Sequence, residues 1–146
     1  MKLFGGKIWF GFLIVLIACF LFAFTKTADP FEKIIAAFEK HLVEIPQEKV
    51  YLHFDRPYYA SGETIWLKAY LAAGPFHEPS LLSSTVYVEL INSEGEIVRH
   101  LKLFAPEGSA AGQLHLPDSL SSGNYLLRSY TNWMRNSGED YFFHSQ

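Results

Sequence analysis

The stretch that decides the fold is EKVYLHFDRPYYASGETIWLKAYL, residues 48–71. Two runs in which polar and apolar residues alternate flank a break that contains Asp55-Arg56-Pro57 and, further on, Gly62-Glu63. Alternation with a period of two is typical of β-strands, and Asp, Pro and Gly are the residues that turns require. The stretch therefore predicts two strands joined by an ordered turn, in which Asp55, Arg56, Pro57, Gly62 and Glu63 have a structural role.

The same period continues to the end of the chain and predicts seven strands. They are expected at residues 49–54, 64–71, 85–92, 97–104, 112–116, 124–131 and 140–144. Turn residues separate them, and no long helical pattern intervenes. Short strands with frequent turns favour an all-β fold, an immunoglobulin-like antiparallel β-sandwich.

Two details within these strands carry structural predictions. Alternation places Trp66 and Tyr70 on the same side of their strand, and we expect that side to face the core. Gly123 and Tyr125 stand at the start of a late strand, which suits a tyrosine corner whose hydroxyl bonds to the upstream backbone.

A short amphipathic helix is predicted ahead of the strands. Asp29 suits the N-cap, Pro30 the first helical position and Glu32 the third residue after the cap. The helix should end near Glu44, before Ile45 and a proline. The expected organisation is an N-terminal address at 1–28, the helix and a linker at 29–46, and the sandwich domain at 47–146.

The N-terminus has the pattern of an export signal. Two lysines precede an apolar run over residues 8–24, which as a helix would be roughly 26 Å long against a hydrocarbon core of about 30 Å. Three fates stay open: cleavage as a signal peptide, retention as a transmembrane anchor, or lipidation at Cys19, which follows a lipobox-like Leu16-Ile17-Ala18. All three export the body, and the last two attach it to a membrane.

Composition excludes several functions. The chain has 12 basic and 15 acidic residues, and three of the lysines precede Asp29, so the body lacks the basic stripe that nucleic-acid binding needs. The single cysteine lies in the apolar run, and the six histidines show no metal-ligand spacing. No nucleophile elbow or phosphate loop is present. We therefore predict no enzyme activity, no cofactor and no metal.

The residues also resemble a known family. Val50 to Trp66 resembles the opening of a macroglobulin-like domain, with its Asp-Lys/Arg-Pro-x-Tyr and Gly-Glu/Asp-Thr segments. Residues 87–96 and 116–128 resemble a later strand-and-turn and the closing strand pair of that domain. Residues 129–136 look like the tail of this domain at the N-terminus of large bacterial cell-envelope proteins. The resemblance implies an envelope or periplasmic location, and a chain that stops inside the last strand makes a truncated domain an alternative.

The expected function is that of a non-enzymatic structural or interaction module, which leads a larger multidomain protein and binds a protein partner or the domains that follow. Trp133, Met134 and Arg135 are predicted to contact that partner, because they form an aromatic and basic segment in a loop. Two alternatives remain: a component of an alpha-2-macroglobulin-like endopeptidase inhibitor, although the thioester motif of such traps is absent, and a carbohydrate-binding module with an exposed aromatic platform.

Overall fold

The computed structural model describes residues 13, 16–17, 20 and 29–146. Cys19, the site of one of the three alternatives for the N-terminus, and most of the apolar run lie outside the described residues. No helix within the described part of the chain has both the length and the apolar character needed to cross a membrane. Residues 42–146 form one compact unit, which holds all the strands found among the described residues.

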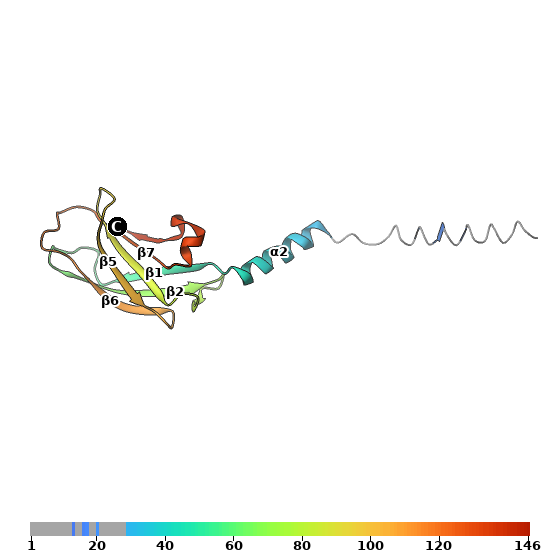
Figure 1. Ribbon diagram of the computed structural model, residues 1–146, viewed down its shortest axis with the longest axis horizontal. Coiled ribbons are helices and arrows are strands. Elements are labelled where there is room, and N and C mark those ends of the chain that lie inside the picture. The colour runs from blue at the N-terminus through green and yellow to red at the C-terminus, as the bar shows by residue number, and fades with distance from the viewer. Residues whose placement is uncertain (1–12, 14–15, 18–19, 21–28) are drawn as a thin grey trace, which may run out of the picture. The chain divides into compact units, whose positions relative to one another are not determined.

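Eight strands form two antiparallel four-stranded sheets, so a β-sandwich-like fold describes this unit (Figure 1). In the first sheet, β2 pairs with β1, β3 and β6; in the second, the order is β5-β4-β7-β8. The strands of the first sheet are β1 (Glu48–Phe54), β2 (Thr64–Ala73), β3 (Glu78–Pro79) and β6 (Ser109–His115). Those of the second are β4 (Thr85–Ile91), β5 (Ile97–Phe104), β7 (Leu126–Tyr130) and β8 (Phe143–Ser145).

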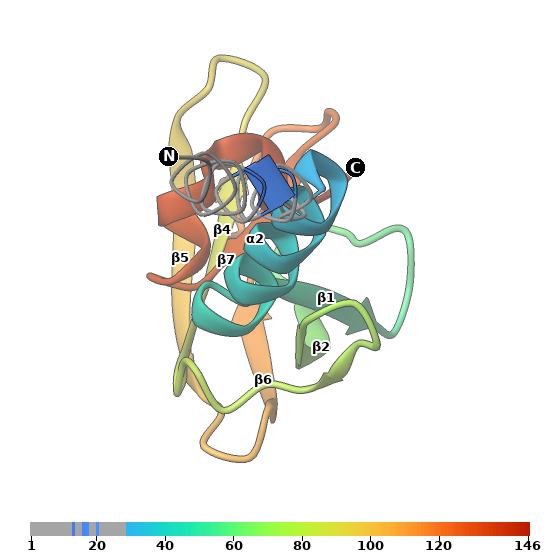
Figure 2. The same ribbon diagram turned by 90° about the vertical axis from the view of Figure 1, so that its right-hand side faces the viewer.

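The core lies between the two sheets. In the view rotated by 90°, β4, β5 and β7 lie on one side of the body and β1 and β2 lie on the other (Figure 2). In β1 and β2 every second residue is buried, because side chains alternate along a strand. The buried set includes Val50, Leu52, Ile65, Leu67, Val86, Val88, Leu103 and Leu114.

Helix α2 (Pro30–Glu44) begins and ends where the sequence predicts. The carboxylate of Asp29 accepts the backbone N–H of Phe31 at 3.0 Å, and the carbonyl of Asp29 accepts the N–H of Lys33 at 3.2 Å. These are the bonds of an N-cap residue, which satisfies donors that the first helical turn leaves unpaired.

Several strand boundaries differ from the prediction. The two-residue β3 has no apolar alternation that could reveal it, and it forms because Pro79 and its neighbour align with the end of β2. The predicted strand at 140–144 was wrong in its first half: residues Glu139–Tyr141 form the 3-10 helix η2, and β8 starts only at Phe143. A second 3-10 helix, η1, covers Met134–Ser137.

Candidate functional site

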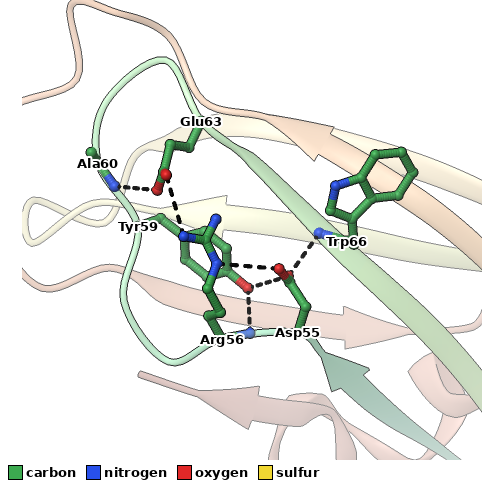
Figure 3. A network of polar contacts seen from close by, with 6 residues as sticks. All are labelled: Asp55, Arg56, Tyr59, Ala60, Glu63 and Trp66. Atoms are coloured by element: carbon green, nitrogen blue, oxygen red, sulfur yellow. Dashed lines mark hydrogen bonds and ion pairs between the residues drawn. The ribbon is translucent and has the colours of Figure 1, made fainter.

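The turn between β1 and β2 is held by a network around Asp55 (Figure 3). One oxygen of its carboxylate accepts the hydroxyl of Tyr59 at 2.6 Å and the backbone N–H of Trp66 at 3.1 Å. The backbone N–H of Asp55 donates to the carbonyl of Trp66 at 3.1 Å. Asp55 thus extends the β1–β2 pairing by one residue, through its backbone and its side chain together.

Arg56 and Glu63 close the other half of this turn (Figure 3). The guanidinium of Arg56 lies 3.3 Å from the carboxylate of Asp55 and 3.2 Å from that of Glu63. The second oxygen of Glu63 accepts the backbone N–H of Ala60 at 2.8 Å. The turn residues therefore satisfy one another's hydrogen bonds, and Arg56 offsets one of the two negative charges.

The same hydrogen bonds shift the pKa values of Asp55, Tyr59 and Glu63. The Tyr59 hydroxyl bond lowers the pKa of Asp55 below its usual value, and the N–H of Ala60 does the same for the pKa of Glu63. Partial burial, together with the bond to Asp55, raises the pKa of Tyr59 to about 12. Both carboxylates are stabilised in their charged form and the phenol in its neutral form, which suits a structural turn and not a proton-transfer site.

Trp66 points away from this network (Figure 3) and lies on the outer face of the first sheet. The prediction that Trp66 and Tyr70 face the core was wrong. They do share one side of β2, but the alternate residues Ile65, Leu67, Ala69 and Leu71 occupy the inward positions. The aromatic pair is therefore left on the solvent side.

The outer face carries a third aromatic side chain, from β1. Tyr51 is directly opposite Tyr70 in the ladder, and Lys68 lies between Trp66 and Tyr70 on the same side of β2. Trp66 and Tyr51 each expose 59% of their surface, and Tyr70 exposes 40%. The ammonium of Lys68 lies 4.9 Å from the centre of the Tyr70 ring. We call Tyr51, Trp66, Lys68 and Tyr70 the aromatic face.

A shallow hollow of about 570 Å³ adjoins Trp66 on this sheet. Polar side chains of three strands and of the turn reach it: His53, Asp55, Lys68 and Gln113. On its opposite border β6 contributes the small outward side chain of Ala111 and the backbone of Gly112, whose own Cβ position faces inward toward Leu103. The hollow and the aromatic face together form a surface with one large exposed ring, small neighbours and several hydrogen-bonding groups.

The predicted contact residues near the end of the chain lie elsewhere. Met134 is buried, with 1% of its surface exposed, so it belongs to the core and offers no contact in this conformation. Trp133 is half-buried, and its indole N–H donates to the carbonyl of Pro46 at 2.8 Å. Of this trio, Arg135 alone is exposed. The sequence could not show which of the three residues is buried, because a short 3-10 helix starts at Met134 and such a helix has no regular spacing of apolar residues.

Tyr125 donates its hydroxyl to the carbonyl of Ser121 at 2.8 Å, four residues upstream. This is the bond that the sequence leads one to expect of a tyrosine corner. Gly123 lies in the same loop and is exposed. Both residues border a groove between this loop and the β1–β2 turn.

A buried polar cluster escaped the sequence reasoning. Glu48, with 2% of its surface exposed, accepts the hydroxyls of Ser80 at 2.5 Å, Ser83 at 2.7 Å and Thr131 at 2.5 Å. The signal was present, because Glu48, Val50 and Leu52 share the inward side of β1. The hydroxyls of three residues distant in sequence thus supply this buried carboxyl with hydrogen-bond donors.

Among residues 29–146 and the few described before them, no three His, Cys, Asp or Glu side chains converge in a way that could hold a metal ion. A scan against protein-family models and a search of curated proteins found no match to the chain.

Proposed function

We propose that this chain carries a non-enzymatic interaction module of an exported cell-envelope protein, with a macroglobulin-like sandwich that leads a larger multidomain protein. The observation that supports a binding role is the aromatic face. Interfaces are enriched in Trp and Tyr, and here three exposed aromatic side chains gather on one side of two paired strands.

The surroundings of Trp66 favour a protein partner. The Asp55 network fixes the backbone on both sides of the ring, because the carboxylate of Asp55 bonds the N–H of Trp66 and the backbone of Asp55 bonds its carbonyl. A ring presented on a pre-ordered backbone loses little conformational entropy on binding. Lys68 adds a charge that can pair with an acidic group at the rim.

The test is photo-crosslinking in the native cell, so that the protein is probed as it is made and exported. A photo-reactive phenylalanine analogue replaces Tyr51, and the matched control carries it in place of His100, an exposed residue of β5 on the other sheet. We expect a discrete adduct from position 51 only, which Trp66→Ala should abolish. Adducts at both positions, or at neither, would contradict a role for the aromatic face.

Carbohydrate binding is the second candidate, and the hollow beside Trp66 supports it. An aromatic ring can stack on the apolar face of a sugar, while His53, Asp55 and Gln113 can bond its hydroxyls. Affinity electrophoresis in gels that contain envelope polysaccharide distinguishes the two candidates. Retardation of the wild-type chain, lost in Trp66→Ala and kept in His100→Ala, would favour the sugar and replace the first proposal.

A further inference from the structure

Helix α2 exposes a row of apolar side chains along one side. Five large apolar residues recur at the spacing that places side chains on the same side of a helix. No residue of α2 is buried, and each of these five exposes between 36% and 66% of its surface. We call them the apolar stripe: Phe31, Ile34, Ile35, Phe38 and Leu42. A continuous exposed apolar surface of this kind marks a contact with a partner or with a membrane.

The rest of the helix surface has little net charge. α2 contains three glutamates and two lysines, which sum to −1 when its single histidine is neutral. Glu32 and Glu39 border the stripe on one flank, and Lys33 and Lys40 lie on the opposite side of the helix. Whatever covers the stripe is therefore held by apolar contact and not by charge.

The chain places α2 next to a segment that the sequence assigns to the membrane. The apolar run over residues 8–24 ends six residues before Pro30. Six residues span at most roughly 22 Å when fully extended, which is about half the thickness of a bilayer with its head groups. When the run is retained as an anchor, one of its three fates, α2 begins within reach of the lipid surface.

A continuation of the chain after Gln146 would start at the other end of the first strand. Gln146 borders the β1–β2 turn and Phe54, the last residue of β1, whereas α2 leads into β1 at Glu48. The seven residues of β1 span roughly 20 Å. A following segment would have to run back along the whole strand before it met the helix.

A second copy of the helix suits the stripe less well than a bilayer. The stripe runs from Phe31 to Leu42, which is less than two heptads, and a coiled coil is indicated only by three to four. Helices as short as α2 are also marginally stable on their own. A helix that lies in a membrane surface needs no such length, because lipid covers the whole stripe at once.

The end of the sandwich that follows α2 in the chain is apolar too. The backbone N–H of Gly74 donates to the carbonyl of Gln47 at 2.9 Å, which places the loop after β2 beside the start of β1. This loop and the next one expose large apolar side chains: Phe76, Leu81 and Leu82. Both segments that flank the linker thus carry apolar surface, as expected of the part of a protein that faces lipid.

We propose that α2 lies along the outer surface of the membrane that holds residues 8–24, with the apolar stripe at the boundary between head groups and acyl chains. With fifteen residues, α2 is too short to cross a bilayer, and no described helix is able to do so. An interfacial orientation covers the stripe and leaves Lys33 and Lys40 in water. This contact involves α2 and not the aromatic face, so it is independent of the proposed function.

The first experiment measures on which side of α2 the lipid lies. The full chain with Cys19→Ser is reconstituted into phosphatidylcholine vesicles, in which part of the lipid carries a nitroxide quencher near the head group. A fluorophore is attached at Ile35→Cys, in the stripe, or at the matched Lys33→Cys on the opposite side. These labels differ in depth by about 10 Å, so quenching should be about threefold or more stronger at position 35. Equal quenching at both positions, or none at either, overturns the proposal.

Two further variants add the same charge on either side of the helix. With the label at position 35, Phe38→Asp should reduce the quenching to the level of position 33, because it puts a carboxylate into the stripe. Ala36→Asp puts one on the far side and should leave the quenching nearly unchanged. Neither should change the melting temperature of the sandwich, since no residue of its buried core comes from α2. Equal losses in both variants would contradict a lipid contact through the stripe.

Dilution and salt separate the other occupants. With fewer than one chain per vesicle on average, a second copy is not available, and quenching at position 35 should stay the same. A change on dilution would assign the stripe to a second copy and overturn the proposal. Raising the salt from about 0.1 M to 1 M should also have no effect, because salt screens charges and not apolar contacts. Loss of quenching in salt would overturn an apolar contact with lipid.

Discussion

The carboxyl group of Glu48, at the first position of β1, accepts a hydrogen bond from the hydroxyl of Thr131, 83 residues further along the chain, at 2.5 Å. The same carboxyl accepts the hydroxyls of Ser80 and Ser83, and Thr131 in turn accepts the backbone N–H of Met134. One buried residue thus joins the start of the first sheet to the loop before β4 and to the segment after β7.

Replacement of Glu48 should therefore destabilise the whole sandwich. Glu48→Ala leaves three hydroxyls without their acceptor, and we expect a loss of about 2–4 kcal/mol in the free energy of unfolding. Glu48→Gln should lose less, since its amide oxygen still accepts. Urea denaturation measures both, with the exposed Glu94→Gln as the control. A loss below about 0.5 kcal/mol for Glu48→Ala would show that the cluster does not contribute.

Neighbouring residues of β1 should differ sharply in their effect on stability. Leu52 exposes 1% of its surface and Tyr51 exposes 59%. Leu52→Ala should cost about 2–5 kcal/mol, because it removes buried apolar area and leaves a cavity. Tyr51→Ala should cost much less, although it loses an edge contact with Phe143. Thermal unfolding of the two variants under identical conditions checks this, and similar losses would contradict the assigned register.

Gly62 should resist substitution where Gly123 tolerates it. Gly62 has a φ of 81°, and a methyl group there would collide with the side chain of Asp118. Gly62→Ala should therefore destabilise by about 1–2 kcal/mol from the backbone alone. Gly123→Ala meets open space and should change stability by less than about 0.5 kcal/mol. Equal effects in denaturant unfolding would disprove the left-handed conformation of Gly62.

Tyr59 should ionise unusually late. Its pKa is raised to about 12 by partial burial and by its bond to Asp55, so the folded state holds this proton more tightly than the unfolded chain does. The associated stability is present below pH 10 or so and is lost as the pH rises through about 12. The difference between the tyrosinate absorbance titrations of wild type and Tyr59→Phe isolates this group. A midpoint near 10 would refute the hydrogen bond between Tyr59 and Asp55.

At acid pH, stability should depend on pH in the opposite direction and fall as the pH is lowered. The pKa values of Asp55 and Glu63 are lowered in the folded state, so their contribution is present above about pH 4 and is lost as the pH falls further. Melting temperatures recorded from about pH 6 to pH 3 should fall less steeply for Asp55→Asn than for wild type. Asp140→Asn, an exposed control, should follow the wild-type slope. Parallel curves for all three proteins would remove the Asp55 network from the acid response.

By itself, the sequence determined the elements of the fold whose information is local. The alternation of polar and apolar residues located most strands, and Asp29 and Pro30 marked the start of α2. The turn around Asp55 could be predicted because Asp, Pro and Gly are favoured in turns. These features depend on backbone preferences and on neighbours within a few residues, so one segment suffices to reveal them.

Only the tertiary structure decided which side of β2 faces outward, where Met134 goes, and what satisfies Glu48. Each of these depends on segments distant in sequence: Trp66 is exposed because the second sheet covers Leu67 and its inward neighbours, and Glu48 can be buried because Thr131 and Ser80 arrive from elsewhere. Alternation along a strand shows that its two faces differ in polarity, but which face is buried depends on what packs against it. The long-range packing of the two sheets therefore fixed the aromatic face on which the proposed function rests.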